Sequence, residues 1–180
     1  ATINPNVGVV KVPDYRLEEL AKLINPDKLT YATCTFVDIA GLVKGASKGE
    51  GLGNQFLANI REVNLIVHVV RCFNDKEITH VYESVDPIRD VEVINLELIL
   101  ADQDVILRRL SHLIPRVKSG DKKSAFELTV CEKIKKLLDE NKLIKKNFFS
   151  DEEWEIVKTL NLLTSKPILY VANINTDDIA

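Results

Sequence analysis

The chain has 180 residues, 46% of them hydrophobic, and its formal net charge at pH 7 is −3. This length and apolar content allow one sizeable buried core, which excludes a disordered or low-complexity protein. The apolar run from Leu65 to Val70 is interrupted by His68 and is far shorter than the roughly 20 residues of a membrane span, which excludes a membrane-spanning class.

The cysteine pattern indicates a reducing compartment, and the first residues show no leader sequence. Cys34, Cys72 and Cys131 are widely spaced, and each lies among apolar neighbours. This is typical of buried thiols in a reducing environment, so we expect a cytoplasmic protein. The first residues form neither a basic nor an apolar leader and lack an initiator Met, so they are interpreted as a cut end.

Four short apolar runs rich in β-branched and aromatic residues are expected to form buried strands: 8–12, 32–38, 65–72 and 167–174. Helical patterns separate them. Asp14 is a good N-cap for a helix over 16–24, and a second helix should follow Gly53. The alternation predicts an α/β fold with a mostly parallel sheet, whose ligands bind at the carboxyl ends of its strands.

A long helical region interrupts the alternation. Two apolar stripes follow one another in it: Leu107, Leu110, Leu113, Ile114 and Val117, then Leu128, Cys131, Ile134, Leu137 and Leu138. Turn residues at 119–121 separate the stripes, which predicts an antiparallel helical hairpin over 86–147. We expect this hairpin to be inserted into one α/β domain formed by 1–85 and 148–180. A further helix should begin at Ser150, with Glu153 completing a capping box.

The hairpin region is basic, because residues 108–146 contain 12 Lys and Arg against 5 Asp and Glu. Lys122, Lys123, Lys135 and Lys136 are the candidates for contacts with RNA phosphates. The alternative is a solvated helical face that binds nothing.

The run from Thr35 to Leu42 places an aspartate at the end of a strand and a glycine three residues later. In this D-x-x-G arrangement, Asp38 can hold Mg²⁺ through water, and the N–H of Gly41 can approach a γ-phosphate because no side chain blocks it. The alternative is an ordinary turn in which Asp38 accepts local backbone hydrogen bonds.

A glycine-rich segment follows directly, with Gly45, Gly49, Gly51 and Gly53 within nine residues. Such backbone can reorder when a γ-phosphate is bound or lost, whereas a flexible linker rarely interrupts an α/β unit between strand and helix. The chain contains no G-x-x-x-x-G-K-[ST], so we expect the phosphate cradle to be absent and this chain alone to be inactive. It contains no G-x-G-x-x-G either, which argues against a dinucleotide-binding redox enzyme.

The segment from Phe36 to Asn54 resembles switch II of the YchF family, the Obg-like ATPases. The resemblance continues through 56–62, 68–73 and 93–98, and so covers nearly the whole chain. It implies a P-loop NTPase G domain with a helical hairpin insertion. It also implies hydrolysis of ATP or GTP with Mg²⁺, and a monomer that binds the ribosome, at its large subunit or rRNA.

The resemblance assigns further site residues. Thr2 corresponds to the switch I threonine that coordinates Mg²⁺, although Asn4 stands where the family more often has Glu. Leu42 occupies the position of the glutamine that orients water in many switch GTPases, and it cannot do so. The resemblance points instead to His80 as the catalytic group, and the alternative is a surface histidine without a role.

Base recognition in the family comes from an Asn-x-x-Glu stretch, for which this chain offers Asn173, Ile174 and Asn175, with Thr176 in place of the Glu. The lysine and aspartate that select guanine are missing, so ATP is favoured over GTP. The alternative for Asn173 is a simple turn at a strand end.

The leading hypothesis for the function of the whole protein is a ribosome-associated nucleotide switch. The second is a non-hydrolysing ribosome- or RNA-binding protein with a degenerate G domain.

Overall fold

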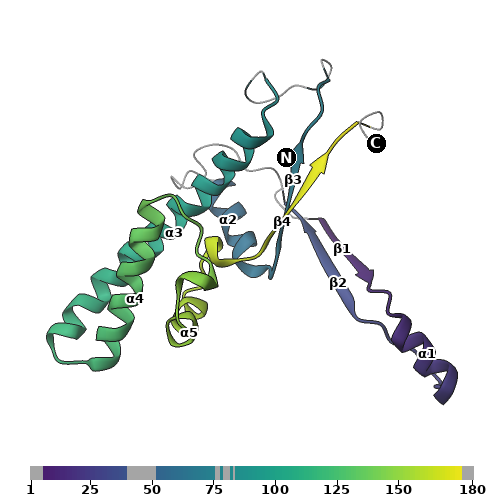
Figure 1. Cartoon of the computed structure of the whole chain (residues 1–180), viewed down its shortest axis with the longest axis horizontal. Helices are drawn as coiled ribbons and strands as arrows, with labels where there is room; N and C mark the ends of the chain where they lie inside the picture. The colour runs from purple at the N-terminus through teal and green to yellow at the C-terminus, as the bar shows by residue number, and fades with distance from the viewer. Residues whose placement is uncertain (1–5, 40–51, 76–77, 79–81, 83, 176–180) are drawn as a thin grey trace. The chain divides into compact units, whose positions relative to one another are not determined.

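The computed structural model of the chain describes residues 6–39, 52–75, 78, 82 and 84–175, with the backbone alone for 52–55. It divides into two compact units, Ala1–Gly41 and Leu42–Ala180. The elements of both units are labelled in Figure 1.

The first unit is an antiparallel strand pair whose connection contains a helix. Strand β1 (Asn6–Lys11) pairs with β2 (Thr33–Asp38), and helix α1 (Tyr15–Ile24) lies between them in the chain. The helix starts as predicted, because the Asp14 carboxylate accepts a hydrogen bond from the Arg16 N–H at 3.0 Å. It ends at Asn25, whose φ of 49° is the left-handed conformation that Asn tolerates.

The prediction that these two strands are buried is wrong. No residue of 6–39 is buried, and Val9 and Phe36 keep 65% and 52% of their surface exposed. A two-stranded pair buries apolar side chains only where another layer covers it, and the described residues of this unit supply none. Cys34 is exposed for the same reason, which corrects the expectation of a buried thiol there.

The second unit contains a parallel strand pair, as predicted. The expectation that these strands are buried is wrong here too, because β4 has no buried residue and Val70 alone is buried in β3. Strand β3 (Ile66–Arg71) pairs with β4 (Ile168–Asn173), in a register that runs from Ile66 opposite Ile168 to Arg71 opposite Asn173. Helix α2 (Leu52–Glu62) precedes β3 and begins at Leu52, so that Gly53 lies inside the helix rather than before it. Equal strand direction brings both carboxyl ends to one edge.

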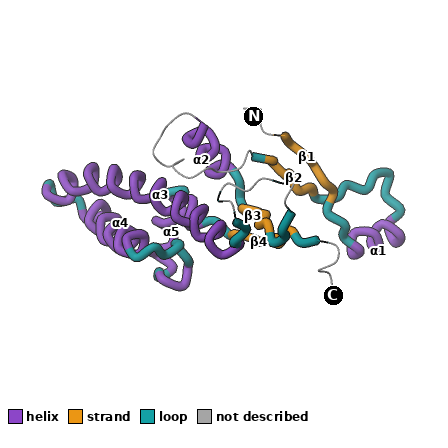
Figure 2. The backbone as a smooth tube through the Cα atoms, turned by 90° about the horizontal axis from the view of Figure 1, so that it is seen from above, coloured by secondary structure: helices purple, strands orange, loops and turns teal. Residues whose placement is uncertain are grey.

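The helical hairpin forms from α3 (Pro87–Lys118) and α4 (Lys122–Asp139). The two helices lie side by side and antiparallel in both views (Figures 1 and 2). Asp86 and Asp121 cap their N-termini, each accepting a backbone N–H. No described helix is both long enough and apolar enough to cross a membrane.

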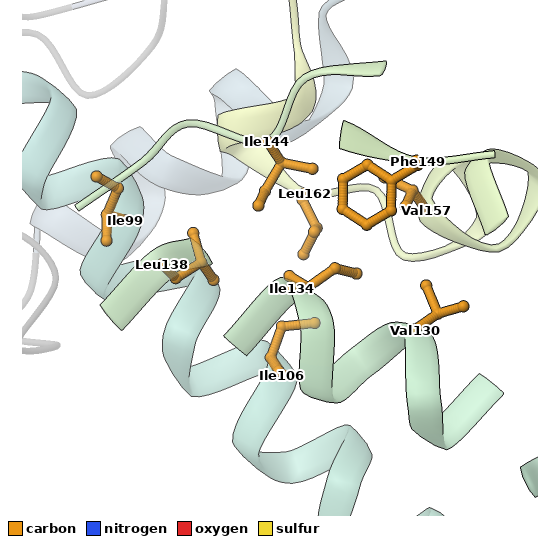
Figure 3. Close-up of a cluster of buried hydrophobic side chains, with 9 residues drawn as sticks. All are labelled: Ile99, Ile106, Val130, Ile134, Leu138, Ile144, Phe149, Val157 and Leu162. Atoms are coloured by element: carbon orange, nitrogen blue, oxygen red, sulfur yellow. The ribbon is translucent and has the colours of Figure 1, made fainter. Parts of the chain in front are cut away.

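One hydrophobic core joins the hairpin to α5 (Asp151–Thr159) and to the chain around it (Figure 3). Its buried members come from α3, α4, α5 and the connecting segments: Ile99, Ile106, Val130, Ile134, Leu138, Ile144, Phe149, Val157 and Leu162. The hairpin therefore packs as part of the second unit. Its limits as an insertion, 86 and 147, stay a prediction.

The predicted stripe on α3 is partly wrong. Leu113 is buried as predicted and Leu110 and Val117 are half-buried, but Leu107 and Ile114 are exposed. Ile106, outside the predicted stripe, is buried instead of Leu107, because the position of α4 decides which side of the helix is covered. The α4 stripe is correct at Cys131, Ile134 and Leu138, all of which are buried.

The last segments lead from the hairpin to β4. The turn η2 (Lys146–Phe148) precedes α5, and η3 (Leu163–Ser165) follows it. The predicted capping box is confirmed, because the Glu153 N–H donates to the Ser150 Oγ at 3.2 Å and the Ser150 N–H donates to Glu153 Oε2 at 2.8 Å.

Candidate functional site

The predicted Mg²⁺ residue Asp38 is the last residue of β2 and is exposed. Among the residues that the structure describes, its carboxylate has no hydrogen-bond or ion-pair partner. An exposed carboxylate at the end of a strand fits a Mg²⁺ ion, which keeps several waters and takes few protein ligands.

The predicted base-recognition residues follow the end of β4. Asn173 is the last residue of that strand, and Asn173, Ile174 and Asn175 are all exposed. The backbone continues the pairing here, because the Cys72 N–H donates to the Asn173 carbonyl at 2.8 Å. Asn173 therefore lies at the carboxyl edge of the β3–β4 pair, where α/β sheets bind ligands.

Arg71, which the sequence analysis overlooked, organises the loop after β3. Its guanidinium donates to the carbonyls of Phe73, Asp75 and Ile78 at 3.0–3.1 Å. The same group lies over the Phe73 ring, 4.7 Å from the ring centroid. One side chain thus ties together Phe73, Asp75 and Ile78, which precede position 80 in the chain.

The other predicted switch and catalytic residues lie outside the described residues: Thr2, Gly41, Leu42, Gly45, Gly49, Gly51 and His80. Their roles stay predictions. Gly53 belongs to the first turn of α2, as its backbone shows.

His68 lies half-buried in β3 beside Tyr170, with ring centroids 5.7 Å apart. Burial lowers the pKa of His68, and the negative charge of Asp90 opposes that shift. The histidine therefore stays neutral near pH 7, as expected of a packing residue. His112 on α3 is exposed.

The four predicted RNA-contacting lysines differ in their surroundings. Lys122, Lys123 and Lys136 are exposed, whereas Lys135 forms an ion pair with Asp139 one turn further along α4. The exposed Arg116 and Lys118, near the tip of the hairpin, were not singled out from the sequence. Together with Lys122 and Lys123 they form the basic tip, and in the described part of the chain none of these four has an ion-pair partner.

A buried polar cluster joins α2, α3 and η3, and the sequence analysis did not find it. Asp102 of α3 is fully buried and accepts hydrogen bonds from the Leu163 N–H at 3.0 Å and the Thr164 N–H at 2.8 Å. The Thr164 hydroxyl donates to the same carboxylate at 2.8 Å, and the Arg61 guanidinium lies 3.5 Å from it.

Burial is the largest influence on the pKa values of Asp102 and Lys166 in this cluster. It raises the pKa of Asp102, while the hydrogen bonds from Thr164 and Leu163 and the charge of Arg61 lower it. Burial also lowers the pKa of Lys166, and nearby Arg61 adds to that effect. A signal was present in the sequence, because Asp102 lies four residues before Ile106 on the apolar face of α3.

The family model described as 50S ribosome-binding GTPase matches residues 1–107. The ribosome-binding ATPase YchF of Bacillus subtilis (strain 168) is 52% identical over 179 residues, which are 99% of this chain and 49% of that protein. The protein of the same name from Haemophilus influenzae is 51% identical over 176 residues, or 98% of this chain and 48% of the relative.

The structure agrees with these sequence matches. The solved structure of the Schizosaccharomyces pombe YchF GTPase matches with a TM-score of 0.80 and 40% identity, over 99% of this chain and 49% of that one. The chain thus spans about half the length of the relatives it matches. The family match covers Asp38 and the glycine-rich segment, and the parallel β3–β4 pair belongs to the expected α/β architecture. The chain belongs to the 50S ribosome-binding GTPase family of P-loop NTPases, and its resemblance to the YchF, Obg-like ATPases is confirmed.

Proposed function

We propose that the protein carrying this chain is a Mg²⁺-dependent nucleoside triphosphatase that acts as a ribosome-associated molecular switch. It hydrolyses the β–γ bond of ATP in preference to GTP, as a cytoplasmic monomer that binds the large ribosomal subunit. The main support is the family match over residues 1–107, which includes Asp38 and the glycine-rich segment that follows it.

Asp38 and Thr2 would hold the metal, Asp38 through water and Thr2 through its hydroxyl. Bound Mg²⁺ supplies positive charge that stabilises the β- and γ-phosphate oxygens during transfer. The carboxylate of Asp38, which is exposed and has no partner among the described residues, fits this role. The N–H of Gly41 would donate to the γ-phosphate, and the glycine-rich segment with Gly45, Gly49, Gly51 and Gly53 would respond to its loss.

His80 would orient the attacking water, because Leu42 has no group that can do so. Arg71 donates hydrogen bonds to three backbone carbonyls between positions 73 and 78, shortly before His80 in the chain. These bonds support the assignment, since a catalytic side chain needs a well-positioned backbone. Asn173, Ile174 and Asn175 would contact the base from the exposed end of β4. The missing guanine-selecting aspartate is the reason for expecting ATP.

The test is hydrolysis of ATP and GTP by the longest natural protein that contains this chain. The Asp38→Asn substitution should lower kcat roughly a hundredfold or more, the size expected when one transition-state charge stabiliser is lost. Asp27→Asn, also exposed in the first unit, is the matched control and should change nothing. Equal rates for Asp38→Asn and the parent protein would remove Asp38 from the mechanism. The 180-residue chain by itself should be inactive.

Ribosome binding would use the basic side of the hairpin: Lys122, Lys123 and Lys136, with Lys135 weakened by its Asp139 partner. Contacts to rRNA phosphates release counterions, so the affinity should fall steeply with salt. Reversing Lys122 and Lys123 to Glu should reduce the slope of log K against log salt by about 2. Lys28→Glu, exposed in the first unit, is the control. Binding that does not change with salt would contradict this assignment.

The second candidate is a ribosome- or RNA-binding protein that does not hydrolyse nucleotide. The basic tip favours it, because four cations without ion-pair partners in the described structure would bind phosphates whether or not the chain turns over nucleotide. It predicts no hydrolysis by the full-length protein and equal ribosome affinity with and without nucleotide.

A further inference from the structure

We propose that the cluster around Asp102 passes the nucleotide state from α2 to the helical hairpin, so that the bound nucleotide sets the affinity of the hairpin for the ribosome. The inference rests on the proposed function and adds its regulation. The observations that carry it are the hydrogen bonds that join the end of α2, the turn before β4 and the middle of α3.

The first half of the connection ties the end of α2 to the turn at 161–166. Lys166 Nζ donates to the carbonyls of Arg61 and Val63 at 3.0 and 2.8 Å, and so caps the C-terminal end of α2 with a positive charge. Arg61 and Asn161 exchange two further bonds: the guanidinium donates to the Asn161 carbonyl at 3.0 Å, and Asn161 Nδ2 donates to the Arg61 carbonyl at 3.4 Å.

The second half ties the same turn to α3. Both oxygens of Asp102 are used, one by the Leu163 N–H and the other by the N–H and hydroxyl of Thr164. The Arg61 guanidinium bonds to both halves, since it lies 3.5 Å from Asp102 and also reaches Asn161. Because Asp102 and Thr164 are buried, water cannot replace these bonds when they stretch.

The connection joins α2, which follows the expected nucleotide-sensing segment, to α3, which leads to the tip of the hairpin. Helix α2 begins at Leu52, directly after the segment expected to reorder with the γ-phosphate. Helix α3 runs without a break from Asp102 to Lys118 at the tip of the hairpin. A shift of α2 must therefore either carry the turn and α3 with it or break several hydrogen bonds. Coupling between two sites can be carried by a hydrogen-bond network of this kind, which joins rigid secondary elements.

The test compares ribosome binding by the full-length protein with ADP and with a non-hydrolysable ATP analogue. In the parent protein the two affinities should differ by about 5–150-fold, the usual range of coupling. Arg61→Gln and Lys166→Met each cut the tie to α2 and should bring the ratio toward one, while nucleotide affinity stays within about threefold. Thr164→Val removes one hydrogen bond of the second half and should also lower the ratio. Ser150→Ala, which removes the N-cap of α5 outside this cluster, is the matched control and should keep the ratio.

Trp154 fluorescence, from the only tryptophan of the chain, confirms that each variant is folded. If Arg61→Gln does not fold, Lys166→Met decides. A parent protein that binds neither nucleotide nor ribosome overturns the proposed function and this inference with it. A parent ratio of one, relay variants that keep the parent ratio, or loss of the ratio in Ser150→Ala would each overturn the inference while the proposed function stands.

Discussion

The first unit and the hairpin with α5 contain similar local signals but differ in burial. Helix α1 has an N-cap and an amphipathic pattern, yet none of its residues is buried. Helix α4 also has a cap and an apolar stripe, and five of its residues are buried. Capping and periodicity specify a helix, whereas a core requires a second layer on the apolar face.

The difference has an energetic consequence. Leu23 in α1 keeps 83% of its surface exposed, whereas Ile134 in α4 keeps none. Full burial of such a side chain contributes about 1.5–3 kcal/mol, and exposure contributes almost nothing. The stability of the chain should therefore come from the hairpin and α5.

The largest expected difference between the two regions is in the reactivity of their cysteine thiols. Cys34 is exposed in β2, whereas Cys131 is buried in α4, where burial raises the pKa of its thiol to about 11. Under native conditions a maleimide should modify Cys34 at least about a hundredfold faster than Cys131, because the reactive species is an accessible thiolate. Mass spectrometry of labelled peptides over time measures both rates. Urea should abolish the difference, and equal native rates would show that α4 is not in a closed core.

Truncation of an apolar side chain should give the next largest effect. Ile134→Ala should lower the free energy of unfolding by about 2–5 kcal/mol, because it leaves a cavity in the core. Leu23→Ala, on the exposed face of α1, should change it by less than about 0.5 kcal/mol. Urea unfolding followed by Trp154 fluorescence measures both changes, since Trp154 packs beside Phe149 in the core. Similar losses for the two variants would contradict the contrast.

Removal of an N-cap tests the same contrast with matched chemistry. Ser150→Ala should lower the free energy of unfolding by about 1 kcal/mol, because α5 belongs to the core and loses its cap bond to the Glu153 N–H. Asp14→Ala removes the cap of α1 and should fray that helix without shifting the Trp154 transition. An equal shift would mean that α1 unfolds together with the hairpin, contrary to its lack of buried residues.

The smallest expected effect is a pH dependence at Glu153. The Lys133 ammonium and the Ser150 N–H lower the pKa of Glu153 from its ordinary 4.5, so its carboxylate stabilises the folded chain above that pH. The contribution is lost as the pH falls through the lowered pKa. Glu153→Gln should cost about 0.5 kcal/mol at pH 7 and almost nothing at low pH, as expected for a partly exposed pair.

The matched control for this substitution is Glu152→Gln, exposed on the same turn of α5. Urea midpoints from Trp154 fluorescence at pH 7 and at pH 3 measure both variants. A cost of Glu153→Gln that does not decrease at low pH would show that the carboxylate acts through packing rather than through its charge.

The strands and helices could be predicted because their signals are local. The run ending at Asp38 and the run ending at Asn173 are strands because β-branched and aromatic residues favour extended backbone. The Ser150 cap fixes the start of α5. For the same reason, Asp38 and Asn173 could be assigned to strand ends from the sequence alone.

The features that could not be predicted depend on distant contacts. Which face of α3 is buried, Ile106 rather than Leu107, depends on where α4 packs. The partners of Asp102 lie more than 60 residues further along the chain at Leu163 and Thr164, and no local pattern connects them. The metal, switch and catalytic roles depend likewise on which groups meet a nucleotide, and they stay predictions.

The length of α3 gives the Asp102 cluster a mechanical meaning. Roughly 24 Å of helix, at about 1.5 Å per residue, extend from Asp102 to Lys118, and α4 stiffens this arm along most of its length. A rotation of about 10° around Asp102 would therefore sweep the tip through about 4 Å. In the proposed relay the hairpin would turn about Asp102, and a displacement of this size at its tip would be enough to make or lose a phosphate contact.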